Sequence, residues 1–472
     1  MGNRKAGSTD LWKVALGSAG LTFLGLWLFS RPLLNRLHDS FLKIVMTDPY
    51  EENFWEFVSA AARTGLQKIV ETNLRAQQGK LIHRPFGSPW RSPGTDGLIF
   101  NLAQLARLPV EENVPVDTKV TLGPRAARPL KISMPIIVSG MAYGLALSEK
   151  AKIALARGAS LAGTATNTGE GPFLPSEREA ARHLILQYTR GGWNHHPDIL
   201  KQADMIEVQF GQAAIGGLGH SSNYDEIPPK GRHLLGLKPG QAAVTHARMP
   251  GIKDPQKDLP PLVTRLRHLT GGVPIGAKIG AGNDLEQDLA ILLEAGVDFI
   301  AIDGAGAASK GSPPIVQDDF GVPTVYAVNR AATFLKKQGV KDKVSLIAGG
   351  GLVTPGDFLK ILALGADAVY IGTIALFALT HTQVLKAMPW EPPVEVVFAR
   401  GRYQDRLDVD KAAHNLANFL RACNAEIMEG VRALGKKSVR QVNKTDLAAL
   451  NPVSARALGI PLAIRPGSNF LS

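Results

Sequence analysis

The stretch from 273 to 304 decides the fold: VPIGAKIG at 273–280 and VDFIAIDG at 297–304 enclose DLEQDLAILLEAG at 284–296. The two outer runs are apolar almost without interruption, and the middle run has apolar residues at helical spacing. Continuous apolar strands joined by an amphipathic helix are typical of a parallel sheet that is covered on both faces. The stretch therefore predicts one strand–helix–strand unit with parallel strands.

The same alternation recurs on both sides of this unit. The other apolar runs are PIIVSG at 135–140, SLAGTAT at 160–166, MIEVQF at 205–210, QAAVTH at 241–246, VSLIAGGG at 344–351 and DAVYIGT at 367–373. With the first two runs they make up the strand count of a (β/α)8 barrel, and their span of about 240 residues has the length of one. The predicted fold class is therefore α/β, a TIM-type (β/α)8 barrel, in which the run at 241–246 is the weakest strand.

Residues 11–30 are expected to anchor the chain in a membrane as an N-terminal transmembrane helix. From Val14 to Ser30 the sequence reads VALGSAGLTFLGLWLFS without a charge, and a span needs about 17–25 apolar residues. Trp12 and Trp27 fall near the two ends, where interfacial aromatic residues sit. An uncleaved signal-like segment or a surface helix is the alternative. Basic residues flank the run equally, so charge leaves its orientation open; a cytoplasmic catalytic domain is expected.

The rest of the chain is expected to divide around the barrel. The predicted parts are the anchor (1–35), a helical and irregular N-terminal extension (36–134), the barrel (135–385), and a C-terminal helical extension that packs on the barrel (386–472). WEFVSAAARTGLQKIVETNLRAQQGK at 55–80 has its apolar residues at helical spacing, so a helix is predicted there.

Composition excludes several classes of protein. Hydrophobic residues make up 45% of the chain and charged residues 20%, which indicates a folded protein with a sizeable core. Cys423 is the only cysteine, which excludes an intramolecular disulfide, a cluster held by several cysteines of this chain and a Cys-rich zinc site. No metal is predicted. The net charge of +12 suits anionic ligands, but no basic tract interleaved with aromatic residues indicates nucleic acid as a partner.

Polar and glycine residues follow nearly every apolar run, at the strand ends where a barrel carries its site. Gly349–Gly351 and Gly372-Thr373 end the last two runs, where barrels place phosphate sites on backbone N–H groups. Tight strand-to-helix turns are the alternative for either cluster. Lys278 ends an apolar strand, and a buried ammonium is costly unless it meets an anion. These positions predict a phosphate-bearing ligand at this end of the barrel.

Several blocks of this sequence resemble the FMN-binding synthase domain of glutamate synthases. The blocks are IIVSGMAYGLALSEKAKIALA at 136–156, TNTGEG at 166–171, GAKIG at 276–280, DGAGAASKGSP at 303–313, GGG at 349–351 and LGADAVYIGT at 364–373. The resemblance covers roughly residues 85–450 and is closest to short, stand-alone members of that family. It implies a (β/α)8 barrel with FMN as its cofactor.

The resemblance also implies roles for individual residues. Glu170 would face the substrate, recognise an amino or iminium nitrogen and take part in proton transfer, so Glu170 and Lys278 are the expected catalytic residues. The alternatives are a hydrogen-bonded loop carboxylate for Glu170 and a snorkelling strand-end lysine for Lys278. The expected cofactor-binding residues are Met141 and Ala142 against the flavin ring, Asn167 and Gln209 at its polar edge, Lys278 near the anionic reduced ring, and Gly349, Gly350, Gly351, Gly372 and Thr373 around the phosphate.

The chain departs from large glutamate synthases in three respects. It has no N-terminal cysteine nucleophile, and no cysteine lies between Ala378 and Arg406, where the family's iron–sulfur ligands would be. In GQAAIGGLGH at 211–220, Ile215 and Leu218 stand where the family carries a lysine and a glutamate. Other cations would then have to hold a substrate carboxylate, and the candidates are Arg190, Arg248 and Lys310.

The expected function is that of a membrane-anchored, FMN-dependent oxidoreductase acting on the C–N bond of an amino or imino acid, as glutamate synthases do. The electron donor or acceptor stays open among another protein, a soluble nicotinamide and a membrane quinone. One alternative is an FMN-dependent 2-hydroxy acid oxidase or dehydrogenase, with His246 as base and Arg248 on the carboxylate. The other is a degenerate, non-catalytic barrel that binds phosphate or flavin at the membrane.

Overall fold

The computed structural model describes residues 30–49, 52–82, 84, 88, 94–212, 215–307, 312–381, 383 and 392–464. The chain forms two compact units, residues 1–82 and 83–472. The finer division at 35, 134 and 385 stays a prediction.

The described part of the first unit is helical. Residues 30–47 form one helix, and α2 (Phe54–Thr64) and α3 (Leu66–Gln78) follow it. The helical spacing predicted at 55–80 is confirmed, but the segment is split at Gly65, whose φ of 84° is open to glycine and costly for other residues.

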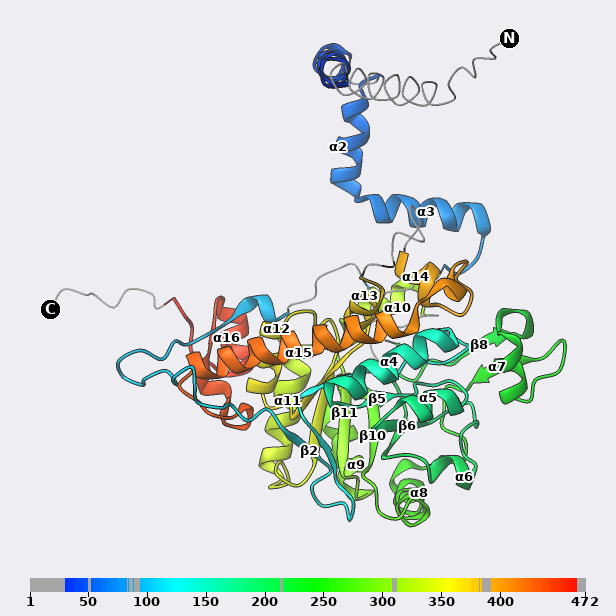
Figure 1. The fold of residues 1–472 in the computed structure, drawn as a ribbon, viewed down its shortest axis with the longest axis vertical. Coiled ribbons are helices and arrows are strands. Elements are labelled where there is room, and N and C mark those ends of the chain that lie inside the picture. The colour runs from blue at the N-terminus through cyan, green and yellow to red at the C-terminus, as the bar shows by residue number, and fades with distance from the viewer. Residues whose placement is uncertain are drawn as a thin grey trace, which may run out of the picture. The chain divides into compact units, whose positions relative to one another are not determined.

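The second unit contains a closed barrel of eight parallel strands, as the sequence predicts (Figure 1). Each barrel strand pairs with the next barrel strand along the chain. The last strand pairs with the first, where Val369 lies beside Ile136. The strands are β4 (Ile136–Val138), β5 (Thr166–Asn167), β6 (Leu184–Tyr188), β7 (Met205–Gln209), β10 (Ile275–Gly280), β11 (Phe299–Asp303), β12 (Ser345–Gly349) and β13 (Ala368–Ile371).

Helices follow the strands around the outside of the barrel (Figure 1). They are α4 (Glu149–Ala162), α5 (Pro175–Ala180), α6 (Pro197–Leu200), α8 (Pro255–Leu269), α9 (Leu285–Glu294), α10 (Pro314–Asp319), α11 (Thr324–Lys337), α12 (Pro355–Ala363) and α13 (Thr373–Thr380).

One predicted strand is shifted and one is wrong. Most of the run at 160–166 belongs to α4 and the turn after it, and β5 begins only at Thr166. The run at 241–246 contains β9 (Ala242–Thr245), which pairs antiparallel with β8 (His220–Asn223) outside the barrel. Residues of β9 alternate between more buried and more exposed positions, as in a hairpin with one covered face. The third barrel strand is instead β6, whose five residues LILQY are all buried.

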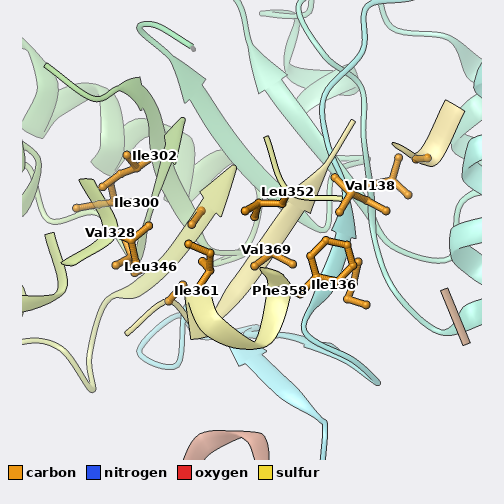
Figure 2. Packing of buried hydrophobic residues seen from close by; sticks show 14 of the residues in the cluster. Ile136, Val138, Ile300, Ile302, Val328, Leu346, Leu352, Phe358, Ile361 and Val369 are labelled. Carbon is orange, nitrogen blue, oxygen red and sulfur yellow. The ribbon is translucent and has the colours of Figure 1, made fainter. Parts of the chain in front are cut away.

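The barrel strands bury both faces. Figure 2 shows part of the outer layer, where side chains of β4, β11, β12 and β13 meet those of α11 and α12; the labelled residues are Ile136, Val138, Ile300, Ile302, Val328, Leu346, Leu352, Phe358, Ile361 and Val369. The inner faces form a second cluster that includes Ile137, Ile185, Met205, Phe299 and Ile347. This cluster also contains the buried residues of β2 (Val120–Leu122) and β3 (Leu130–Ile132), so this hairpin fills the N-terminal end of the interior.

The C-terminal segment packs on the barrel helices. The 25-residue helix α15 (Val409–Ala433) lies along α4, where Gly158 leaves room for Leu416. The remaining described elements are β1 (Leu98–Phe100) and β14 (Leu447–Ala449), which pair antiparallel, with α7 (Pro229–Leu234), α14 (Pro392–Val397) and α16 (Pro452–Leu458), and the short 3-10 turns η1 (Thr95–Gly97), η3 (Tyr224–Glu226), η5 (Gln404–Arg406), η6 (Val439–Gln441) and η7 (Lys444–Asp446).

The prediction of a single-pass membrane protein is corrected by the structure. Within the ranges described above, no helix combines the length and the apolar character needed to cross a bilayer. Helix α15 is long enough, but charged residues recur along it. The helix over 30–47 likewise carries Arg31, Arg36 and Lys43. Residues 11–29 of the predicted anchor lie outside the described residues.

Candidate active site

A layer of polar side chains closes the C-terminal end of the barrel interior. Successive side chains of a strand point to opposite faces, so every second residue of a barrel strand points into the interior. At this end the inner positions are polar and buried, and they are Asn167, Gln187, Glu207, Gln209, Lys278, Asp303 and Tyr370. Below them the interior is apolar, so the strand register itself separates the packed core from a site.

Glu207 is the centre of this layer. Its Oε1 accepts hydrogen bonds from Asn167 Nδ2 at 2.9 Å and from Gln187 Nε2 at 2.7 Å, and its Oε2 accepts from the Tyr370 hydroxyl at 2.7 Å. The carboxylate is fully buried, and one acceptor group therefore fixes side chains from three other strands. Burial, together with the charge of Glu207, raises the pKa of Tyr370 well above its ordinary value, so this hydroxyl remains a donor.

Lys278 forms a buried ion pair with Asp303. Lys278 Nζ lies 3.0 Å from Asp303 Oδ2, and both side chains are less than a tenth exposed. Burial lowers the pKa of Lys278, but the charges of Asp303, Glu207 and Glu170 together outweigh it, and the net pKa is raised. The ammonium is therefore a permanent positive charge in the layer. Lys278 does meet an anion, but the anion in this structure is the protein's own Asp303, so its predicted role toward a ligand stays a prediction.

Two glycine-containing loops pack against each other beside this layer. A Cβ on Gly169 would lie 2.5 Å from the backbone of Met141, and a Cβ on Gly171 would lie 2.7 Å from the Tyr143 nitrogen. Gly169 also has a φ of 69°, which glycine adopts without strain. Met141 and Ala142 lie half-buried on the first loop, so the TNTGEG block and the block before it form one joined surface.

Lys152 supports this surface from below. It is fully buried in α4, and its Nζ donates to the carbonyl oxygens of Asn167 at 3.0 Å and Thr168 at 3.1 Å. It also lies 2.9 Å from Glu177 Oε1 in α5. Burial raises the pKa of Glu177, and Lys152 opposes that shift. The ion pair therefore ties the backbone of the loop to two helices.

Glu170 and Arg190 form a third buried ion pair, above the layer. Glu170 Oε1 accepts from Arg190 Nε at 3.0 Å, and Oε2 accepts from Nη2 at 3.1 Å. The remaining Arg190 nitrogen, Nη1, donates to the Gly217 carbonyl oxygen at 2.7 Å. Both oxygens of the predicted catalytic carboxylate and the whole of the predicted substrate-binding guanidinium are thus engaged with the protein.

The glycine clusters after β12 and β13 offer unused backbone donors. The N–H groups of Gly351, Gly372 and Thr373 have no hydrogen-bond partner among the residues that the structure describes. Gly372 and Thr373 begin α13, whose N-terminal N–H groups point away from the helix. Gly349 and Gly350 pack closely: a Cβ would lie 2.5 Å from Asp303 Oδ1 and from Thr324 Oγ1, respectively. This backbone can hold an anion without a charged side chain.

The structure brings some predicted residues together and leaves others apart. Asn167 and Gln209 both belong to the polar layer, but Asn167 is fully engaged, because its Oδ1 accepts from the Gly169 N–H at 2.9 Å. His246 and Arg248 are exposed in the loop after β9 and belong to no barrel strand. Lys310 lies outside the described residues.

Four buried groups at the site are absent from the residues that the sequence singled out. They are Gln187, Glu207, Tyr370 and Lys152. Gln187 was missed because its strand was not recognised. Glu207 and Tyr370 sit inside apolar runs that were recognised, and a single polar residue near the end of such a run is the signal that could have identified them.

Comparisons with known proteins agree with this architecture. A sequence profile described as the conserved region in glutamate synthase matches residues 100–437. The chain belongs to the glutamate synthase family. A glutamate synthase large subunit-like protein of Rhizobium meliloti is 32% identical over 418 residues, which cover 84% of this chain and 93% of that protein. An archaeal-type glutamate synthase [NADPH] of Thermotoga neapolitana is 30% identical over 71% of this chain and 66% of its own length.

Membership of the glutamate synthase family indicates an oxidoreductase. Among solved structures, a double-mutant flavocytochrome b2 with pyruvate bound aligns with a TM-score of 0.50 at 18% identity, over 80% of this chain and 83% of that one. This likeness concerns the fold alone. It agrees with the closed barrel, and the residue roles come from the geometry above.

Proposed function

We propose that this glutamate synthase family member is an FMN-dependent oxidoreductase that acts on the C–N bond of an amino or imino acid. The observation that supports it most is an acceptor without a partner: Gln187 Oε1 is buried and meets no hydrogen-bond donor in the described part of the chain. Gln187 is held through its amide nitrogen by Glu207, so its free oxygen suits an N–H group of a bound ligand, such as that of a flavin ring.

The donors available at the strand ends fit the phosphate of FMN. The free N–H groups of Gly351, Gly372 and Thr373 would bind phosphate oxygens, and the start of α13 adds a favourable dipole. When bound, FMN would supply reversible hydride transfer, which no side chain of this protein can perform. The cradle follows β12 and β13, and the layer includes Asp303 of the neighbouring β11 and Tyr370 of β13 itself. The layer and the cradle therefore adjoin, and one ligand with a ring and a phosphate suits both.

Lys278 would provide fixed positive charge at the reacting end of the site. Asp303 holds the ammonium in place, and burial of both groups keeps water from screening the charge. A positive charge fixed beforehand favours any negative charge that develops on a bound ring, at no cost of reorganisation. Lys278 is thus the residue proposed to control the reduction potential of the cofactor.

Glu170 is proposed to be held in one orientation by its ion pair with Arg190. Arg190 donates to both carboxylate oxygens, so the carboxylate cannot rotate without losing a hydrogen bond. Glu170 would then recognise a positively charged nitrogen of the substrate through its fixed negative charge, and Arg190 would position it. Arg248 stays a candidate for the substrate carboxylate.

The electron donor or acceptor is proposed to be a soluble nicotinamide, with another protein as the alternative. The names of the Thermotoga relatives include NADPH, which makes NADPH the first donor to test.

Spectroscopy of the purified protein tests the proposal directly. We expect flavin absorption bands, FMN as the flavin released by heat, and bleaching of the bands by NADPH or by an amino acid under anaerobic conditions. Lys278→Met should lower the flavin content. Lys341→Met is its matched control, because Lys341 pairs with Asp367 at 2.8 Å near the opposite end of β13.

Other outcomes would assign the protein differently. Bleaching by 2-hydroxy acids and not by amino acids would favour the hydroxy acid oxidase. A protein that neither contains nor takes up FMN would favour the non-catalytic barrel.

A further inference from the structure

A cavity lies at the opposite end of the barrel from the polar layer. It has a volume of about 300 Å³ and is lined by Arg128, Pro129, Leu130, Lys131, Arg182, His183, Asp204 and Val273. Arg182 and His183 directly precede β6, Asp204 precedes β7, and Arg128 to Lys131 belong to the β2–β3 hairpin. The strand starts and the hairpin therefore form this cavity together, and no residue of the candidate active site contributes to it.

The lining carries positive charge that the protein does not neutralise. Arg128, Lys131 and Arg182 have no carboxylate within ion-pair distance among the described residues, and the guanidinium of Arg128 donates only a long hydrogen bond, of 3.4 Å, to the Thr270 carbonyl oxygen. Asp204 is the acidic residue of the lining. Its Oδ2 accepts from Arg178 at 2.7 Å and from the Leu184 N–H at 2.8 Å, so its charge is already compensated.

The pKa of His183 reflects the charges around this cavity. Its pKa is lowered by burial first, with Arg182 and Arg178 lowering it further and Asp204 opposing them. The imidazole therefore stays neutral and keeps one N–H donor and one acceptor. Arg128, Lys131 and Arg182 are exposed at the rim of the cavity, where they can reach an incoming anion, and guanidinium groups match the oxygens of phosphate in geometry.

We propose that this cavity binds a phosphate-type oxyanion, with Arg128, Lys131 and Arg182 as its cationic contacts and His183 as a neutral donor. The volume admits a phosphate together with a small organic group. Leu130 and Val273 supply an apolar wall for that group. The site is independent of the proposed function, because it shares no residue with the flavin cradle or the polar layer.

Calorimetric titration of the full chain with inorganic phosphate tests this site by measuring the dissociation constant of phosphate. The double variant Lys131→Gln/Arg182→Gln should weaken phosphate binding by about tenfold or more, because it removes two charge-assisted contacts. The matched control is Lys119→Gln/Lys238→Gln, which removes the same charge from two exposed lysines outside the lining. The control should leave the dissociation constant unchanged.

Two results would overturn the proposal. Equal weakening in both double variants would mean that phosphate responds only to net charge. Unchanged binding in Lys131→Gln/Arg182→Gln would place the phosphate elsewhere, such as at the glycine cradle. A second readout is the imidazole NMR signal of His183, whose pKa should rise when phosphate binds beside it, and a pKa that does not move would also contradict the site.

Discussion

Arg190 joins Glu170 to the segment between β7 and β8. Its guanidinium contacts both oxygens of the Glu170 carboxylate at 3.0 and 3.1 Å and donates to the Gly217 carbonyl oxygen at 2.7 Å. Arg190 is fully buried. The two side chains come from the ends of neighbouring strands, and one arginine thus connects the TNTGEG loop, the end of β6 and the segment before β8.

Removing one partner of this pair should be costly. Glu170→Gln or Arg190→Gln leaves a buried group without its counter-charge, so we expect each to lower the free energy of unfolding by about 3–5 kcal/mol. The double variant should cost less than the sum of the two. Denaturant unfolding measures all three. The exposed pair Arg157–Asp410 is the control, and Arg157→Gln should cost about 0–1 kcal/mol. Equal losses of unfolding free energy at the Glu170–Arg190 and Arg157–Asp410 pairs would contradict the conclusion that Glu170 and Arg190 stabilise the fold as a buried pair.

The Lys278–Asp303 pair should make a contribution to stability that does not change with pH over the neutral range. The folded pKa of Lys278 is raised above its ordinary value, so the stabilisation is fully present below the ordinary lysine pKa and is lost only as pH rises through the folded pKa. The difference in unfolding free energy between wild type and Lys278→Met should therefore stay constant from about pH 6 to 9. A difference that already falls at pH 8 would show that Lys278 is deprotonated in the folded protein.

Gly169 should tolerate alanine less well than a glycine of the same backbone conformation in open space. Gly169 and Gly236 have φ angles of 69° and 65°, but only at Gly169 would an added methyl group lie 2.5 Å from backbone atoms. Gly236→Ala should cost about 1 kcal/mol from strain alone. Gly169→Ala should lower the free energy of unfolding clearly more, because the loop carrying Met141 must move, and it should also weaken binding of the proposed flavin. Thermal unfolding measures both losses of stability. Equal losses for Gly169→Ala and Gly236→Ala would show that backbone strain alone accounts for both.

Lys152 should matter more than its neighbour on the same helix. Lys152→Met removes two hydrogen bonds to the 167–168 backbone and leaves Glu177 buried alone, for which we expect a loss of about 3–5 kcal/mol. The double variant Lys152→Met/Glu177→Gln should recover part of that loss. Lys150→Met, at a partly exposed position two residues earlier, is the control. If Lys152→Met/Glu177→Gln recovers stability but does not bind the proposed flavin, Lys152 positions the 167–168 loop in addition to stabilising the fold.

Much of the architecture could be predicted because it depends on local pattern. Continuous apolar runs followed by amphipathic helices predicted the parallel barrel, and polar residues at the strand ends predicted which end carries the site. The prediction failed at β6 and β9. LILQY is a short run after a short helix, and the strand-like run at 242–245 has a period that does not distinguish a hairpin from a barrel strand.

The sequence by itself determined that Lys278 lies near the C-terminal end of a buried strand and that glycines lie at the ends of the last two strands. Burial and chain direction follow from the order of residues along each unit. Only the tertiary structure decided what these groups meet. Glu207 accepts hydrogen bonds from Asn167, Gln187 and Tyr370, which belong to three different strands. Arg190 forms an ion pair with Glu170. Such partners depend on the register in which strands pair around the barrel and on how the loops above them pack. Those are contacts between residues distant in sequence, and no local pattern encodes them.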